Sequence, residues 1–154
     1  MIQGSIAMKK TISHAVFGKL SRYDDHVYST VHWASQLVQI VIYASDQTVR
    51  SVLDRSVGLL TNQEIWIQKI EKCVKRRVEQ GAADFIVPKE LRNKFIESLK
   101  LVCIEIRLFD EGIGVEFLHH SSLGEIDGGV SRRSIVVSGY IDSDLDDLEI
   151  RGGD

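Results

Sequence analysis

Histidines are the residues of this chain whose type and spacing could support chemistry. His26 and His32 share one face of a predicted strand with a tyrosine and a threonine, and His119-His120 ends another predicted strand. The first two histidines are roughly 20 Å apart along an extended strand, too far to share a metal ion. Either one could still approach His119-His120 if the sheet brings the strands together. Because no cysteine or carboxylate stands nearby at zinc-ligand spacing, we expect no metal site and no cofactor.

Catalytic sequence motifs are missing from the chain. It contains no nucleophile elbow, P-loop, His-Glu-x-x-His pattern or dinucleotide-binding glycines. The paired carboxylates Asp24-Asp25 and Asp110-Glu111 fall in polar stretches typical of turns. We therefore predict no catalytic residues, and a small hydrolase or metal-assisted enzyme using the histidine-bearing sheet face is the alternative function.

Carboxylates gather near the C-terminus and in the connection before the last long strand. An acidic edge of this kind suits contact with a basic protein, because complementary charge speeds encounter and orients docking. The other interpretation is a solubilising tail that discourages strand-to-strand aggregation. The predicted partner-binding residues are Glu125, Asp127, Asp142, Asp144, Asp146, Asp147 and Glu149.

Basic residues form two smaller groups. One lies toward the end of a predicted helix, where positive charge is favoured by the helix dipole, and the other is Arg132-Arg133, just before a strand. The formal net charge is -3, which argues against general nucleic-acid binding, since phosphate contacts need a concentrated basic surface. The helical group consists of Lys69, Lys72, Lys75, Arg76 and Arg77.

Length and composition fit one cytoplasmic domain. The 154 residues suffice for one core, and we place the domain at residues 13–152 after a flexible lead-in at residues 1–12. Cys73 and Cys103 have neither zinc-ligand nor disulfide-framework spacing, which indicates buried thiols in a reducing compartment. No stretch approaches the roughly 20 apolar residues of a membrane helix.

The elements that position these residues follow from hydrophobic periodicity. Three N-terminal strands are expected, at 14–20, 26–33 and 37–43, with a tight turn at Ala34-Ser35. Two helices follow, with a break near Thr61, where Thr61 and Glu64 match a capping box. The second helix runs to about Gln80, and its apolar stripe consists of Trp66, Ile70, Cys73, Val74 and Val78.

A third helix and a strand meander complete the pattern. Pro88 suits the first turn of a helix that carries Phe95 on its apolar ridge. Residues 101–109 then alternate, with Val102, Ile104, Ile106 and Leu108 on the predicted core side. A turn at 110–112 and a second strand follow. After them come a run at 134–141 that is covered on both faces and a short edge strand at 148–150. The sequence predicts an α+β domain whose helices pack on one face of a mainly antiparallel sheet.

The order of these elements resembles a known family. It includes Phe17-Gly18, a hairpin with Trp33, helices around Trp66 and Phe95, and a final Ser-Ile-Val-Val-Ser-Gly strand at 134–139. This is similar to the family named domain of unknown function 2262. That family typically has a phenylalanine, a Gly-His pair and a final glycine, where this chain has Val130, Arg132-Arg133 and Gly152. Without the histidine, no role of that residue carries over.

Small α+β proteins similar to this family often occur beside polymorphic bacterial toxins as immunity proteins. The resemblance therefore implies a non-enzymatic protein-binding domain, and we predict a cytoplasmic immunity protein that neutralises a cognate toxin. A basic toxin domain would be the partner of the acidic edge. A structural subunit of a larger assembly is a third possibility.

Overall fold

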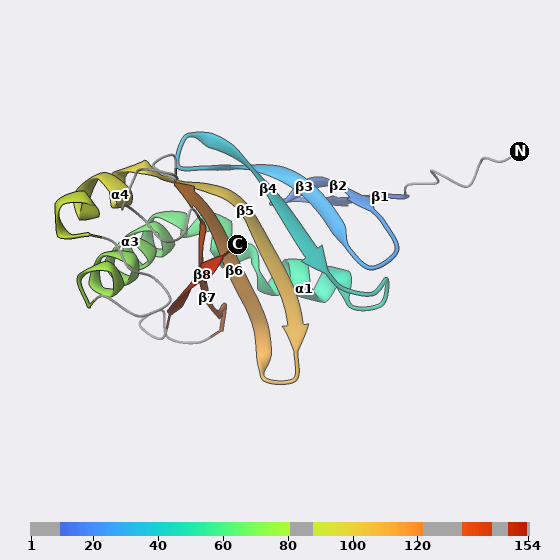
Figure 1. The fold of residues 1–154 in the computed structure, drawn as a ribbon. Coiled ribbons are helices and arrows are strands. Elements are labelled where there is room, and N and C mark those ends of the chain that lie inside the picture. The colour runs from blue at the N-terminus through green and yellow to red at the C-terminus, as the bar shows by residue number, and fades with distance from the viewer. Residues whose placement is uncertain (1–9, 81–87, 122–133, 143–147, 154) are drawn as a thin grey trace, which may run out of the picture.

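The computed structural model describes residues 10–80, 88–121, 134–142 and 148–153. Eight strands form one sheet whose spatial order follows the chain from β1 to β8 (Figure 1). Neighbouring strands are antiparallel except β4 and β5, which run parallel. The predicted α+β class with a mainly antiparallel sheet is confirmed.

Four strands precede the helices, rather than the predicted three. They are β1 (Lys10–His14), β2 (Gly18–Arg22), β3 (Val27–Trp33) and β4 (Gln36–Tyr43). The single strand expected at 14–20 is wrong, because the chain reverses there into a β1–β2 hairpin. Gly18 permits the reversal with a φ of +74°, and the imidazole Nδ1 of His14 accepts the N–H of Val16 at 3.1 Å. The predicted domain start at residue 13 falls inside β1.

The β3–β4 hairpin turns at Ala34-Ser35, as the sequence predicts. Both residues have left-handed φ angles, 49° and 71°, which match the twist of a two-residue hairpin but are more usual for glycine or asparagine. Contacts from outside the turn are therefore expected to stabilise this backbone conformation.

The helices between β4 and β5 are α1 (Val49–Arg55), α2 (Val57–Thr61), α3 (Gln63–Gln80), η1 (Lys89–Leu91) and α4 (Arg92–Ser98). The predicted break near Thr61 and the buried stripe of α3 are confirmed. The capping-box role of Thr61 is wrong, because its hydroxyl donates to the carbonyl of Val57 in the preceding turn. No helix in the described ranges is long and apolar enough to cross a membrane.

The predicted meander forms the second half of the sheet. Its strands are β5 (Leu99–Phe109), β6 (Gly112–Ser121) and β7 (Ser134–Tyr140), followed at the edge by β8 (Glu149–Gly153). Burial of Ile135, Val136 and Val137 at successive positions confirms that this part of β7 is covered on both faces. Because the helices carry the chain across the sheet, β5 joins β4 as a parallel neighbour.

The predicted core side of β5 holds only in the middle of the strand. Ile104 and Ile106 are fully buried, but Val102 is 48% exposed and Leu108 is 41% exposed. A β-bulge between Leu101 and Cys103 shifts the register, so that Leu101 takes the buried position and Val102 turns away from the core.

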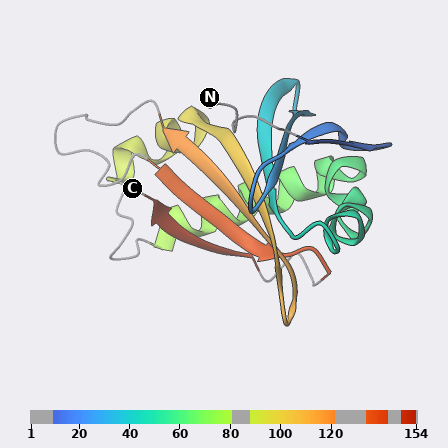
Figure 2. The same cartoon turned by 90° about the vertical axis from the view of Figure 1, so that its right-hand side faces the viewer.

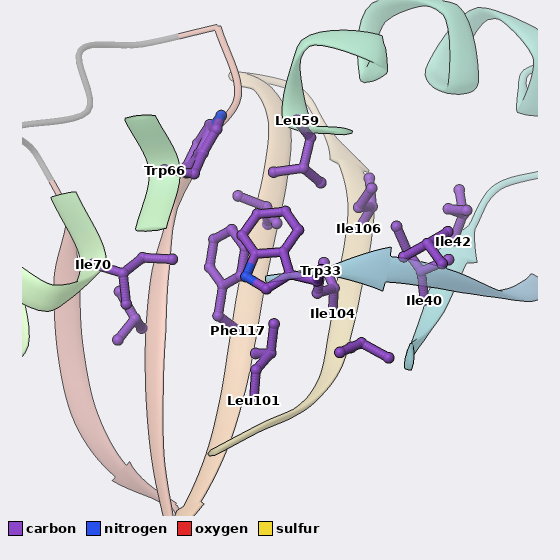
Figure 3. Close-up of a cluster of buried hydrophobic side chains, with 14 of the residues drawn as sticks. Trp33, Ile40, Ile42, Leu59, Trp66, Ile70, Leu101, Ile104, Ile106 and Phe117 are labelled. Atoms are coloured by element: carbon purple, nitrogen blue, oxygen red, sulfur yellow. The ribbon is translucent and has the colours of Figure 1, made fainter. Parts of the chain in front are cut away.

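The core lies between the sheet and its helices. Figures 1 and 2 show α1 and α3 against one face of the sheet. At the centre, the ring of Phe117 on β6 packs between Trp33 and Trp66, with centroid distances of 5.7 and 5.5 Å (Figure 3). These aromatic contacts join β3, β6 and α3, and so fix the helical layer on the sheet.

Candidate functional site

The face of the sheet opposite α1 and α3 carries the polar and aromatic side chains of the strands, and we call it the open face. Strand register places its residues in rows across the sheet. One row consists of Tyr28, Val41, Glu105, Glu116, Ser138 and Glu149. The next row contains Tyr43, Arg107, Gly114 and Tyr140.

Two glutamates stand directly opposite each other on the open face. Glu105 of β5 pairs with Glu116 of β6, and like charges in this position are destabilising. Two arginines offset the repulsion. The guanidinium of Arg107 is 3.3 Å from Glu105, and that of Arg151 on β8 is 2.9 Å from Glu116. The result is a charged network that spans β5, β6 and β8.

Arg107 is also held by an aromatic ring. Its guanidinium carbon lies 3.8 Å from the ring centroid of Tyr43 on β4, a cation–π contact that orients the planar group. The Tyr43 ring in turn contacts His26 at 5.6 Å between centroids. Arg107 is thus preorganised while its side chain stays 43% exposed.

Aromatic side chains also stand at the other end of the charged network. The rings of Phe109 and Tyr140 meet edge to face at 6.3 Å, although the two residues are 47% and 38% exposed. Gly114 makes room for this arrangement, since a Cβ there would lie 2.6 Å from the Phe109 ring. The aromatic pair lines one open hollow of about 480 Å³ on the open face, together with Glu105, Arg107 and Glu116 of the charged network.

Of the predicted acidic edge, only Asp142 and Glu149 lie among the described residues. Glu149 is exposed and lines the hollow. Asp142 follows β7 at the same end of the β7–β8 pair, and its carboxylate accepts from Arg55 of α1 at 2.8 Å. The remaining predicted residues, Glu125, Asp127, Asp144, Asp146 and Asp147, lie outside the described residues.

The structure does not bring the histidines together. His120 is on the open face with His32, but β4 and β5 lie between their strands, so their backbones are about 14 Å apart. His119 points to the helical side, next to Leu101. The Nδ1–H of His26 donates to the carboxylate of Asp25 at 2.7 Å. Among the described residues, no group of three or more His, Cys, Asp or Glu could hold a metal.

The other sequence candidates take separate positions. The basic group of α3 lies in the helical layer, where Arg76 and Arg77 share a pocket with Glu149 at the β8 edge of the sheet. Arg132-Arg133 falls outside the described residues. Cys103 shares an open-face row with Leu118. Burial raises the pKa of the Cys103 thiol to about 11 and also raises the pKa of the Cys73 thiol. Both cysteines are therefore protonated near neutral pH and poor nucleophiles.

Of the residues that line the hollow, sequence reasoning named only Glu149 as a site residue, although it placed Glu105, Arg107 and Phe109 on the side of β5 away from the core. The sequence analysis did not assign the register in which β5 pairs with β6. The turn of β5 and β6 contains only Asp110 and Glu111, and a two-residue turn sets Glu105 opposite Glu116.

Comparison of the chain with family models, curated proteins and solved structures finds no significant match. The site must therefore be interpreted from its own chemistry.

Proposed function

We propose that this chain is a non-enzymatic domain that binds another protein through the open face, and that it serves as a cytoplasmic immunity protein against a bacterial toxin. The observation that carries the first part is the hollow around Arg107. An exposed arginine, already oriented by Tyr43, stands beside the exposed pair Phe109 and Tyr140. Arginine and aromatic residues are the types that dominate the binding energy of protein interfaces.

The charge of the hollow favours a basic partner. Among the described residues that line it are three carboxylates, those of Glu105, Glu116 and Glu149, and one cation, Arg107. Arg151 approaches Glu116 from β8, so the balance stays acidic. The acidic edge predicted from the sequence would extend this field, and complementary charge accelerates the encounter with a basic toxin domain.

The Glu105–Glu116 pair also supports a binding role. A cross-strand pair of like charges lowers stability, and it needs two arginines to compensate it. Such an arrangement is better suited to recognition than to folding, because a simple Thr–Thr or Lys–Glu pair would stabilise the same strands. The toxin-immunity part of the proposal rests on the resemblance seen in the sequence, although no family model matches the chain.

The test uses the C-terminal domain of the protein encoded next to this gene as the partner. We expect the wild type to bind it and to protect cells that express it. Arg107→Ala with Tyr140→Ala should weaken binding by about tenfold or more, the loss typical of interface anchors. The measurement is isothermal titration calorimetry, with growth of cells expressing the toxin domain as the second readout.

Lys75→Ala with Ile65→Ala is the matched control, since both residues are exposed on α3 in the helical layer. It should leave binding and protection unchanged. Equal losses in both double variants would contradict docking on the open face. If the wild type fails to bind at micromolar concentration, immunity to that toxin is wrong.

A further inference from the structure

A pocket of about 400 Å³ lies on the other side of the sheet from the hollow, beside α3 and α4. Its size is within the range of small-ligand sites, roughly 300–1,000 Å³. The turn of the β3–β4 hairpin, α3, α4, β5 and β6 all contribute to its wall. The apolar lining includes Trp33, Ile67, Ile70, Val74, Leu99 and Leu101.

His119 supplies a polar group with a defined role. Its Nδ1 lies 3.1 Å from the carbonyl oxygen of Phe117. A carbonyl can only accept, so Nδ1 carries the hydrogen and Nε2 of the neutral ring is an acceptor. Burial lowers the pKa of His119 to about 4, which keeps the ring neutral near pH 7. The imidazole therefore offers a lone pair to the pocket and no positive charge.

The charged residues that line the pocket are both acidic. Glu71 on α3 and Glu97 on α4 are exposed at its opening, and none of the described lining residues is lysine or arginine. The indole of Trp33 and the amide of Gln36 are the remaining polar groups, and both are uncharged. An apolar wall with two carboxylates and no lysine or arginine among its described residues matches a ligand that is apolar at one end and cationic at the other.

We propose that this pocket binds a small amphipathic amine, with its hydrocarbon body against Ile70 and Leu101 and its ammonium group at the opening. Glu71 and Glu97 accept from the ammonium, and Nε2 of His119 accepts a further N–H. This site is independent of the protein-binding function, because it lies on the opposite side of the sheet from the open face.

The experiment titrates the full chain with hexylamine, hexanol and hexanoate, which share one hydrocarbon body. Heteronuclear NMR follows the backbone signals of α3 and β6. We expect saturable binding of hexylamine, at least about tenfold weaker binding of hexanol, and no binding of hexanoate, because charge-assisted hydrogen bonds are stronger than neutral ones. Equal binding of amine and alcohol, or no saturable binding of the amine, would overturn the proposal.

Glu71→Gln with Glu97→Gln should lower the affinity for hexylamine about tenfold and leave hexanol unchanged. The control is Glu64→Gln with Glu79→Gln, which removes the same charge from exposed positions of α3 that do not line the pocket. An equal loss in the control would mean general attraction to an acidic protein and would overturn the proposal. A capped lysine peptide that binds as tightly as hexylamine would assign the pocket to a protein side chain instead.

Discussion

The backbone N–H of Ala34 donates a hydrogen bond to the side-chain oxygen of Gln63 at 3.0 Å. The side-chain nitrogen of the same glutamine donates to the carbonyl of His32 at 3.2 Å. The first residue of α3 thus holds both sides of the β3–β4 turn. This contact compensates the two left-handed residues of the turn, each of which costs about 1 kcal/mol or more without glycine.

Gln63→Ala should therefore lower the free energy of unfolding by about 1–3 kcal/mol, because the turn loses both hydrogen bonds that support it and the bond to the carbonyl of Leu60 is lost as well. Urea denaturation followed by circular dichroism measures the effect. Gln68→Ala, at an exposed position of the same helix, is the control and should change stability by less than about 0.5 kcal/mol. Similar values for the two variants would show that Gln63 does not stabilise the turn.

The β-bulge in β5 predicts losses of stability of very different size at two positions that simple alternation treats alike. Ile106→Asp places a charge at a fully buried site and should cost several kcal/mol, enough to unfold a typical domain. Val102→Asp introduces the same charge at a site that is 48% exposed, and it should change stability by about 1 kcal/mol or less. Thermal melts of both variants distinguish them, and a cooperative melt of Ile106→Asp at the wild-type temperature would refute the register.

The local parts of the fold could be predicted from the sequence, since they depend on residues close together in the chain. The stripe of α3 from Trp66 to Val78 and the Ala34-Ser35 turn are of this kind. The bulge beside Cys103 left no signal, because one extra residue in a strand changes neither its composition nor its length noticeably. The parallel pairing of β4 with β5 also left none, since it depends on how the helices cross the sheet.

The candidate site was predicted less well for the same reason. Arg107 lies on Tyr43 only because β4 and β5 are neighbours. A contact between two strands with α1 to α4 between them in the sequence has no sequence pattern. The partner of Asp142 is Arg55, on α1, which periodicity cannot identify either. Acidic residues near the C-terminus were easy to find, but their spatial relation to the hollow depends on tertiary structure.

The depressed pKa of His119 predicts a pH dependence of stability. The folded chain holds this ring neutral down to about pH 4, whereas the unfolded chain protonates it near pH 6.5. Below about pH 6.5 the unfolded chain binds a proton at His119 that the folded chain does not. The free energy of unfolding therefore decreases as the pH falls from about 6.5 toward 4, by up to about 3 kcal/mol. His119→Gln should reduce this slope, measured by urea denaturation across that range.

His32→Gln is the matched control, because His32 is exposed on the open face, and it should keep the wild-type slope. Because carboxylates also titrate below pH 5, the effect of His119 is measured as the difference in pH slope between the two variants. Parallel slopes in the two variants would contradict a buried, neutral His119.

The acidic edge makes a kinetic prediction for the proposed immunity function. Replacing Asp144, Asp146 and Asp147 by asparagine should leave the unfolding transition nearly unchanged, because the sequence predicts surface positions. Association with the toxin domain should slow and lose much of its salt dependence, since exposed charges are screened over about 10 Å at roughly 0.1 M salt. Stopped-flow association rates across a salt series measure both effects.

A charge-matched control separates steering by this edge from steering by net charge. The control variant changes three exposed glutamates of the helical layer to glutamine and so removes the same charge. They are Glu64, Glu79 and Glu90. If the acidic edge directs docking, the control should keep association rates and salt slopes close to those of the wild type, because charges far from the contact surface are screened. If association slows equally in both triple variants, the acidic edge acts only through the net charge of the protein. Wild-type rates in the asparagine variant would mean that the C-terminal carboxylates only keep the protein soluble.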